Sequence, residues 1–424
     1  MDVRLAYGRK GLSVRLPDGA AVTVLEPAHE EALADPRAAL REALRRPLEG
    51  PPLRELARGA AKVGVVFNDI TRPTPNRLIL PAVFEELAAA GLKPGRITLF
   101  NATGTHRADT PAELEGMLGA ETARRYRIVQ NDARAAGVHV RLGRTPGGNE
   151  VWILREFMDC DLKILTGFIE PHFMAGFSGG GKAVMPGLAR LDTVMRNHGA
   201  RNIDDPRCTW GLTEGNPLWE DARAAARLAQ PGFLVNVALN RDKAVTAVFA
   251  GEWEKAHARG CAWVKERAMV PVAEPFDIVL TSNSGYPLDL NLYQAVKGMS
   301  AAALVLKPGG SILIAAECWD GIPEHGAFGE LLAQAPSPEE LLRTVRAPGY
   351  AREDMWEAQL LALVRLKGRV YVYSEGLSDE QIRSAHLEPC RSIEATVDEL
   401  MRECGPGARI CVLPEGPQTI PYLQ

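Results

Sequence analysis

Short runs of apolar residues alternate along the chain with longer amphipathic segments. Continuous apolar runs at 62–67, 96–100 and 162–166 predict buried strands, and the segments 36–45 and 80–90 predict helices. Strands without a polar face are typical of a sheet covered on both sides, and intervening helices of this length indicate parallel pairing. The first half of the chain is therefore predicted to form an α/β domain with a mostly parallel sheet.

A second α/β series follows a helical stretch at 252–269. Its predicted strands and helices lie, in chain order, at 276–280, 292–306, 311–315, 369–373, 379–386, 393–404 and 409–413. We therefore expect two α/β domains, at 1–270 and 275–405, with a tail of about 409–424 able to pack back on the first. Clefts at domain interfaces are favoured ligand sites, so we expect the active site there.

The opening segment differs from both series. Residues 3–25 alternate apolar and polar positions around Pro17-Asp-Gly19. That pattern predicts a β-hairpin whose turn lies at this tripeptide.

Composition narrows the class of protein. With 424 residues, 46% apolar and 24% charged, the chain resembles a soluble globular protein, and a net charge of −4 gives no reason to expect nucleic acid or an anionic membrane as partner. No apolar run is long enough to span a bilayer, and no signal peptide is apparent, which predicts a cytoplasmic protein. Seven scattered cysteines without a C-x-x-C pair argue against disulfides and a thiolate zinc site.

The most informative stretch is 167–186, which places His172 ten residues before Lys182 with a run of three glycines between them. Part of it, Gly176–Ala183, resembles a phosphate loop, but Ala183 stands where a Walker motif needs Ser or Thr to hold magnesium. Backbone amides of a glycine turn at a helix N-terminus still suit an anion. A nucleotide- or phosphate-binding transferase therefore remains an alternative.

Two further histidines, His106 and His198, lie like His172 among Gly, Asn and Pro residues that are typical of loops. Loops on a rigid scaffold often carry function, and imidazole serves both proton transfer and metal binding. A lone histidine is more often structural, however, and sequence spacing shows no contact among these three. A non-catalytic metal- or nucleotide-binding protein on the same scaffold is a further alternative.

Two pairs of polar residues could bind an anion. Asp69 and Arg72 follow a predicted strand at the edge where open α/β sheets bind ligands, and Arg72 could hold a carboxylate bidentately. The same two residues could instead simply organise a turn. Gln294 and Lys297 lie three apart on one face of a predicted helix, where a solvated face is the alternative.

Six short motifs, taken together, resemble the LarA family of nickel-pincer-nucleotide-dependent lactate racemases and related 2-hydroxyacid racemases. The motifs occur in the family's order: Asp69-x-Thr-Arg-Pro, Gly104-Thr-His-Arg, Glu170-Pro-His, Gly176-Phe-Ser-Gly-Gly-x-Lys, Asn197-His and Tyr293-Gln-x-x-Lys. The resemblance implies an isomerase that racemises or epimerises lactate or a related 2-hydroxy acid by reversible hydride transfer. A planar keto acid formed in this way can take hydride back on either face.

The resemblance also implies roles for individual residues. Lys182 would be joined covalently to the cofactor, a pyridinium-3-thioamide-5-thiocarboxylic acid mononucleotide with nickel, and His198 would ligate the metal. His106 and His172 would be the paired acid/base groups, and Asp69 would support a neighbouring histidine or arginine. The implied partners are a small 2-hydroxy acid and the enzymes that make and load the cofactor.

Two sets of binding residues follow from the same resemblance. Cofactor contacts are implied for Lys182, Asp69, Ser178, Gly179 and Gly180. Substrate contacts are implied for Arg72, Tyr293, Gln294, Lys297 and Trp356. One departure is Gly181, which stands where the lactate enzyme that typifies the family has arginine.

Overall fold

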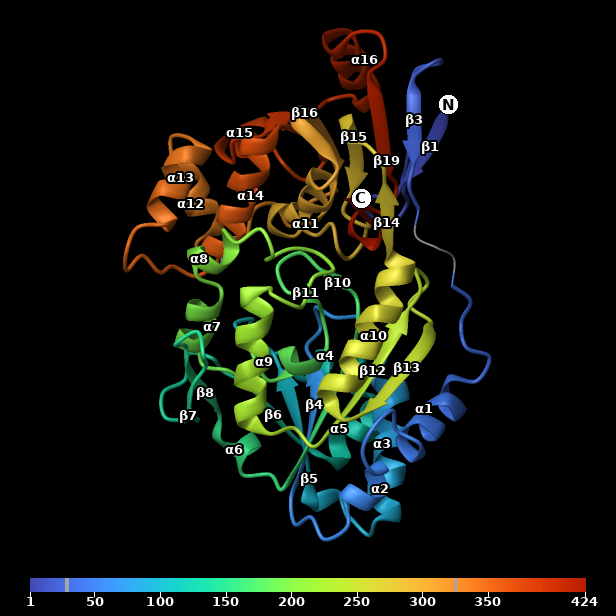
Figure 1. The fold of residues 1–424 in the computed structure, drawn as a ribbon, viewed down its shortest axis with the longest axis vertical. Helices are drawn as coiled ribbons and strands as arrows, with labels where there is room; N and C mark the ends of the chain where they lie inside the picture. Colours follow the sequence, from blue (N-terminus) through green and yellow to red (C-terminus); the bar gives the residue numbers. More distant parts are fainter. Residues whose placement is uncertain (27–29, 324–325) are drawn as a thin grey trace. The chain divides into compact units, whose positions relative to one another are not determined.

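The computed structural model describes residues 1–26, 30–323 and 326–424 (Figure 1). The chain divides into two compact units: a first unit of residues 29–198 and 205–266, and a second unit of residues 1–28, 199–204 and 267–424. Each contains a six-stranded, mostly parallel sheet with helices packed on it. The predicted α/β class with two mostly parallel sheets is confirmed.

The first unit contains helices and strands from α1 to α10. In chain order these are α1 (Pro36–Arg45), α2 (Leu53–Leu56), β4 (Val63–Asn68), α3 (Asn76–Ala89), β5 (Ile97–Ala102), α4 (Pro111–Leu118), α5 (Ala120–Arg125), β6 (Arg127–Gln130), β7 (His139–Arg144), β8 (Glu150–Leu154), α6 (Arg155–Met158), β9 (Leu162–Phe168), β10 (Pro171–His172), β11 (Gly176–Phe177), α7 (Leu191–Asn197), α9 (Pro217–Ala229), β12 (Phe233–Leu239), β13 (Val245–Gly251) and α10 (Trp253–Ala268), the last of which crosses the boundary between the units.

The sheet of the first unit has the order β13-β12-β9-β4-β5-β6, and only the edge strand β13 is antiparallel. Both faces are covered, because successive residues of the central strands enter two different cores. Val65 and Phe67 of β4 pack with α1, α2 and α3, whereas Val66 packs with α6, α9 and the start of α10. This two-sided burial explains why the strands read as continuous apolar runs.

The second unit contains the remaining elements. They are β1 (Asp2–Leu5), β2 (Leu12–Arg15), β3 (Ala21–Val24), α8 (Ala200–Ile203), β14 (Met269–Val272), β15 (Phe276–Ser282), α11 (Leu292–Ala303), β16 (Leu306–Ala315), α12 (Phe328–Gln334), α13 (Pro338–Val345), α14 (Met355–Lys367), β17 (Arg369–Tyr373), α15 (Asp379–Ser384), β18 (Glu388–Pro389), α16 (Ile393–Cys404), β19 (Arg409–Leu413) and β20 (Ile420–Leu423).

The sheet of the second unit has the order β18-β17-β16-β15-β19-β3, with every pair parallel. Helix α16 and the β1–β2 hairpin cover one face, where Ile393 and Leu5 share a core with Leu280. Helices α11 and α14 contact the sheet through β16 and pack against each other.

The N-terminal hairpin differs from the sequence prediction. Its two strands are β1 and β2, and its turn spans residues 6–11, where Gly8 and Gly11 have positive φ angles of 46° and 72°. The tripeptide Pro17-Asp-Gly19 instead leads into β3, which joins the main sheet beside β19. Pairing with a strand almost 400 residues away cannot be seen in a local alternation pattern.

The chain passes between the units at residues 266 and 267, near the predicted boundary at residue 270, but the opening residues are placed differently. The opening residues group with the C-terminal half, because β3 pairs with β19. The tail stays in that half as well, since β20 pairs with β14. The tail therefore does not return to the first unit.

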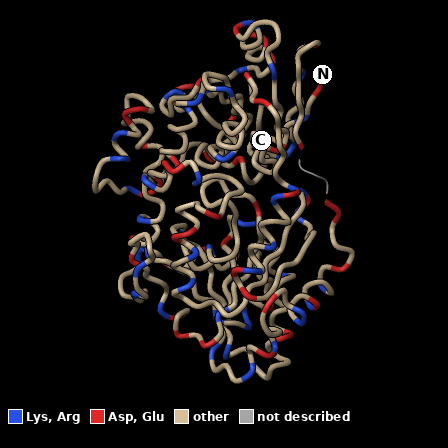
Figure 2. Tube along the Cα trace, in the orientation of Figure 1, with Lys and Arg blue, Asp and Glu red and all other residues tan. Residues whose placement is uncertain are grey.

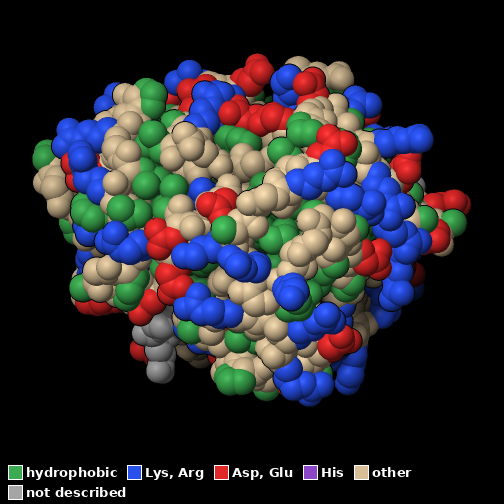
Figure 3. Space-filling view, turned by 90° about the horizontal axis from the view of Figure 1, so that it is seen from below, with side chains coloured by type: hydrophobic (Ala, Val, Ile, Leu, Met, Phe, Trp, Pro, Cys, Tyr) green, Lys and Arg blue, Asp and Glu red, His purple; other side chains and the backbone are tan. Residues whose placement is uncertain are grey.

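Charges of both signs are interspersed along the trace and on the face shown in space-filling form (Figures 2 and 3). All seven cysteines are free thiols, and six of them are buried. Within the part of the chain that the structure describes, no helix combines the length and apolar character needed to cross a membrane.

Candidate active site

Three neighbouring strands of the first unit end beside one another and lead into the loops that carry the predicted site residues. Strands β9, β4 and β5 are adjacent and parallel, so their carboxyl ends lie at one edge of the sheet. The chain passes from β4 to β5 and β6 on one side and later places β9 on the other. Such a reversal of strand order leaves a crevice at which open α/β sheets bind ligands.

Asp69 and His106 meet at this edge. Asp69 directly follows β4, and its Oδ2 lies 2.6 Å from Nδ1 of His106, in the loop after β5. The Thr71 hydroxyl donates to the other oxygen, Oδ1, at 2.7 Å. Burial acts to raise the pKa of Asp69, but the hydrogen bond and charge of His106, with the charge of Arg72, hold it below its ordinary value. An ionised Asp69 requires Nδ1 of His106 to be the donor, which leaves Nε2 as a base.

The histidine loop is tied to the glycine-rich segment through the backbone. Gly104 donates its N–H to the carbonyl of Gly187 at 3.0 Å, and Gly187 in turn donates to the carbonyl of Lys182 at 3.1 Å. The Asn131 side chain donates to the carbonyl of Gly104. These hydrogen bonds place the loop that carries His106 beside the segment that carries Lys182.

His172 lies on a small hairpin that β10 forms with β11. Its Nδ1 accepts hydrogen bonds from the backbone N–H groups of Met174 and Ala175, each at 3.2 Å. Because Nδ1 accepts, the neutral ring carries its proton on Nε2. That nitrogen lies 3.3 Å from Nζ of Lys182. The structure therefore brings together two residues that lie ten positions apart in the sequence.

The hairpin requires glycine at position 176. Gly176 has a φ of +76°, and a Cβ there would lie 2.2 Å from the carbonyl oxygen of Leu212. Asn216 accounts for this close approach, because its amide donates to the carbonyls of both Met174 and Leu212. The local chain path at His172 is thus fixed by backbone contacts.

The segment after the hairpin differs from a phosphate loop. It passes into a short 3₁₀ turn, Gly180–Ala183, instead of a long α-helix, so the helix N-terminus expected for an anion is absent from this segment. The Ser178 hydroxyl donates to the carbonyl of Phe168, and the N–H of Gly180 donates to Oδ1 of Asn236 at 2.9 Å. The cofactor contacts expected of Ser178, Gly179 and Gly180 remain predictions.

His198 is buried at the C-terminal end of α7. Burial, with the positive charge of Lys182, lowers the pKa of His198 to about 3, so the ring is neutral. Its Nδ1 faces the carbonyl of Val194 at 3.3 Å. A ring that donates its Nδ1–H to this carbonyl has the lone pair of Nε2 available as a ligand, as in histidines that bind metals.

Sequence reasoning missed two buried residues that shape the glycine segment. The ring of His257 lies flat on Trp219, and its Nε2 lies 2.8 Å from the carbonyl of Ser178. A Cβ on Gly180 would come within 2.6 Å of that ring, and one on Gly179 within 2.6 Å of Asn236. Burial lowers the pKa of His257 to about 4, which keeps the ring neutral. Nothing in a helix sequence signals such a contact.

Gly181, the departure from the family pattern, is enclosed by neighbouring side chains. A Cβ there would lie 3.0 Å from Cβ of Ala226 and 3.1 Å from the ring of Trp253. A long side chain would have to displace both. The glycine is therefore matched to the packing of α9 and α10 in this chain.

The remaining predicted residues form a group in the second unit. On α11, Nζ of Lys297 donates to Oε1 of Gln294 at 2.6 Å, which confirms that they share one face of the helix. Nε1 of Trp356, on α14, donates to the Tyr293 hydroxyl at 3.1 Å. Arg72 belongs to the first unit, so a carboxylate clamp that combines Arg72 with Lys297 remains a prediction.

A buried carboxyl group that the sequence did not reveal lies beside this group. Burial raises the pKa of Glu357 to about 8, while the positive charge of Lys297 opposes the rise. Neither of its oxygens has a hydrogen-bond partner among the residues that the structure describes. The charge of Lys297 therefore acts on Glu357 without a hydrogen bond to its carboxyl oxygens.

Matches to known families cover most of the chain. The lactate racemase N-terminal domain matches residues 7–211, and the lactate racemase C-terminal domain matches residues 272–420. The chain belongs to the lactate racemase family. It is accordingly a racemase, which is an isomerase, and the transferase alternative is not supported.

Relatives and solved structures agree with this assignment. The lactate racemase of Thermoanaerobacterium thermosaccharolyticum is 32% identical over 99% of both chains, and that of Lactiplantibacillus plantarum is 36% identical over 88% of both. The structure of the T. thermosaccharolyticum lactate racemase apoprotein matches with a TM-score of 0.91 at 31% identity, covering 100% of both chains. A Thermotoga maritima protein at 19% identity and a TM-score of 0.70, covering 93% of this chain and 100% of its own, shares the fold.

Proposed function

We propose that this racemase acts on lactate or a related small 2-hydroxy acid, by reversible hydride transfer to a nickel-pincer nucleotide joined to Lys182. The observation that carries the proposal is the 3.3 Å approach of the Lys182 amine to Nε2 of His172. A covalent cofactor attached at this amine would begin beside a proton-transferring side chain. The names of the relatives support lactate as the substrate class.

The residues present fit the proposed cofactor. His198 is neutral and buried, and its Nδ1 faces a carbonyl, which is the state in which a histidine binds nickel. Among the described residues, no group of three or more His, Cys, Asp or Glu side chains could hold a metal ion by itself. A nickel at His198 would therefore need ligands from another source, and the pincer nucleotide carries sulfur and carbon ligands of its own.

The two other histidines have complementary roles. When bound, the cofactor would supply the carbon that accepts and returns the hydride. His106, whose Nδ1–H is held by Asp69, offers Nε2 to take the hydroxyl proton. His172, whose Nδ1 is occupied by backbone N–H groups, would exchange the proton on the opposite side through Nε2. Each ring is fixed through one nitrogen and exchanges a proton through the other.

Charged groups would hold the substrate carboxylate. Arg72 follows β4 at the same edge as Asp69, and Lys297 carries a second positive charge on α11. A fixed cation keeps the carboxylate in place while the carbon beside it changes geometry. Each such charged hydrogen bond is worth about 1.5–3 kcal/mol, and we expect its loss to weaken all 2-hydroxy acids alike.

The test combines mass, metal and activity. The chain is produced together with cofactor-synthesis enzymes, and we expect the wild-type protein to gain mass, to bind nickel and to racemise lactate. The gain in mass should be absent from Lys182→Ala, and nickel should be lost from His198→Ala. The variants His106→Asn and His172→Asn should keep mass and nickel but lose about 10²–10⁴ in rate. An unmodified Lys182 in a protein that racemises at full rate would refute the covalent assignment.

A further inference from the structure

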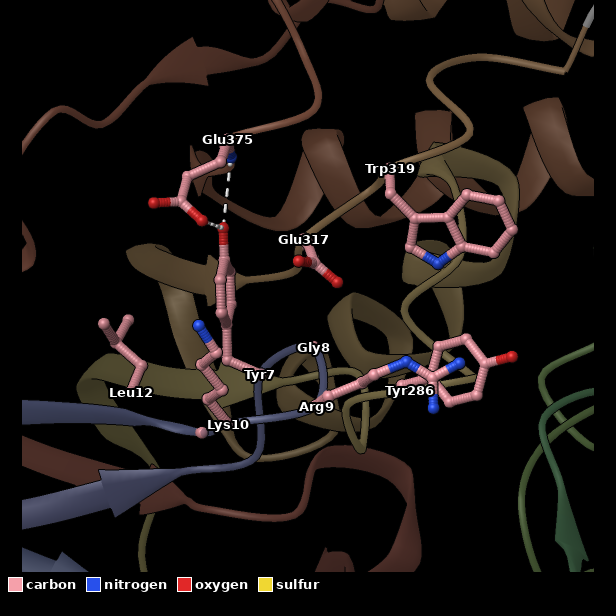
Figure 4. Close-up of a pocket in the computed structure, with 10 residues that line it drawn as sticks. Tyr7, Gly8, Arg9, Lys10, Leu12, Tyr286, Glu317, Trp319 and Glu375 are labelled. Carbon is pink, nitrogen blue, oxygen red and sulfur yellow. Dashed lines mark hydrogen bonds between the residues drawn. The ribbon is translucent and has the colours of Figure 1, made fainter.

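A second site of potential chemistry lies in the second unit, at the carboxyl edge of its sheet. A pocket of about 660 Å³ opens between the turn of the N-terminal hairpin and the loops that follow β15, β16 and β17 (Figure 4). This volume is within the range of small-molecule sites, about 300–1,000 Å³. The residues that line it include none of the site residues described above.

The pocket walls are fixed to each other. Buried Asp289 accepts hydrogen bonds through Oδ2 from the N–H groups of Gly8, at 2.7 Å, and Glu317, at 3.1 Å. The N–H of Tyr286 donates to the carbonyl of Gly8 at 2.9 Å. Gly8 has a φ of +46°, and a Cβ there would lie 2.6 Å from the Glu317 carboxylate. These hydrogen bonds therefore hold the hairpin turn in place as one wall of the pocket.

One side of the pocket is aromatic. Tyr286 and Trp319, each four residues beyond the end of its strand, have ring centroids 6.4 Å apart with an interplanar angle of 28°. Their side chains are 41% and 53% exposed. The guanidinium of Arg9 lies 3.4 Å above the Tyr286 ring, as Figure 4 shows. Exposed aromatic faces of this kind stack flat rings of ligands.

The opposite side carries two carboxylates. Glu317 and Glu375 each lie two residues beyond the end of a strand, and the two strands, β16 and β17, are neighbours. In doubly wound folds, an acidic residue near this edge binds ribose hydroxyls. The Tyr7 hydroxyl accepts from the N–H of Glu375 at 3.1 Å and lies 3.4 Å from its carboxylate, which orients that side chain. Arg9 and Lys10 complete the pocket with positive charge.

We propose that this pocket binds a nucleoside monophosphate, with the base against Trp319 and Tyr286, the ribose diol on Glu317 and Glu375, and the phosphate near Lys10. An aromatic platform, a pair of hydroxyl acceptors and a cationic turn match the three parts of that ligand class. The proposal is independent of the racemase mechanism, because none of the residues that line the pocket has a role in that mechanism.

The test measures binding of adenosine 5′-monophosphate to the full-length protein, without added cofactor, by calorimetry. We expect Trp319→Ala to weaken binding about 5- to 150-fold, the range for loss of one stacking contact. Glu317→Gln and Glu375→Gln should reduce the preference for this nucleotide over its 2′,3′-dideoxy analogue. Lys10→Ala should reduce the preference for it over adenosine.

Two controls locate the ligand. Leu366→Ala removes an exposed apolar side chain of the same unit outside the pocket and should leave binding unchanged. Lys182→Ala should also leave it unchanged, because that residue lies in the first unit. Binding that is lost in Lys182→Ala and kept in Trp319→Ala would place the nucleotide on the glycine segment and overturn the proposal. Absence of binding at millimolar nucleotide would overturn it as well.

Discussion

Replacement of Glu357 by glutamine should remove a pH dependence from the stability of the second unit. The carboxyl is fully buried, and its pKa lies near 8 in the folded protein against 4.5 as the ordinary value. The folded state therefore binds the proton more tightly than the unfolded state. Below about pH 4.5 both states are protonated and burial of the carboxyl is least costly, whereas stability falls as the pH rises towards 8.

The size of the effect follows from the two pKa values. Each tenfold difference in proton affinity corresponds to about 1.4 kcal/mol, so the full loss is at most about 5 kcal/mol. Between about pH 5.5 and pH 7.5 it amounts to about 2.5 kcal/mol. For a unit of this size, 1 kcal/mol changes the melting temperature by about 2–4 °C. The difference in melting temperature between Glu357→Gln and wild type should thus change by about 5–10 °C over this interval, in favour of the variant at the higher pH.

Differential scanning calorimetry of both proteins at the two pH values measures this change. Glu399→Gln is the matched control, because Glu399 is an exposed carboxylate of the same unit and its removal should shift the gap little. A gap that is equal at both pH values would show that Glu357 is ionised throughout. A wild type that gains stability relative to Glu357→Gln as the pH rises would reverse the sign and refute the reasoning.

Three further changes test the first unit. Asp69→Asn should lower the rate of racemisation about 10²–10⁴-fold by releasing the favoured tautomer of His106, while cofactor mass is retained; an unchanged rate would remove Asp69 from proton transfer. Gly176→Ala should lower the free energy of unfolding, measured with denaturant, by more than about 3 kcal/mol, because it combines a positive φ with a clash against a carbonyl. Gly148 has a similar φ but open space around it, so Gly148→Ala should cost only about 1–2 kcal/mol. Equal effects of the two substitutions would contradict the clash. His257→Phe should lower the melting temperature by several degrees, since it leaves the buried carbonyl of Ser178 without its donor at a cost of about 1–3 kcal/mol. An unchanged melting temperature would show that this hydrogen bond contributes nothing to stability.

Local patterns predicted the helices and strands well where periodicity is strong. The helices at 36–45 and 393–404 and the strands at 369–373 and 409–413 were predicted with the bounds that the structure shows. The short strands and turns around β10 and β11 were not predicted, because two-residue pairings have no periodic signal. The pairing of β3 with β19 was missed because it joins distant segments.

For the site, the sequence identified side chains without their contacts. The loop contexts of Asp69 and His106 pointed to a functional edge, but their 2.6 Å contact depends on the register of β4 and β5. The roles of Asn236 and His257 could not be predicted, since both read as ordinary strand and helix residues. Their importance arises only where a glycine brings the backbone against them.

The two histidines proposed as acid/base groups are held through Nδ1 in opposite ways. Nδ1 of His106 faces the Asp69 carboxylate and donates a proton to it, whereas Nδ1 of His172 accepts hydrogen bonds from two backbone N–H groups. In the proposed mechanism one histidine gains a proton and the other loses one in each conversion, so the two would exchange roles for the reverse conversion. Net conversion of one enantiomer therefore requires the protein to reset its protons between turnovers, and at saturating substrate this reset can limit the rate. The protonation state of the protein after a turnover would then depend on the enantiomer that it last converted.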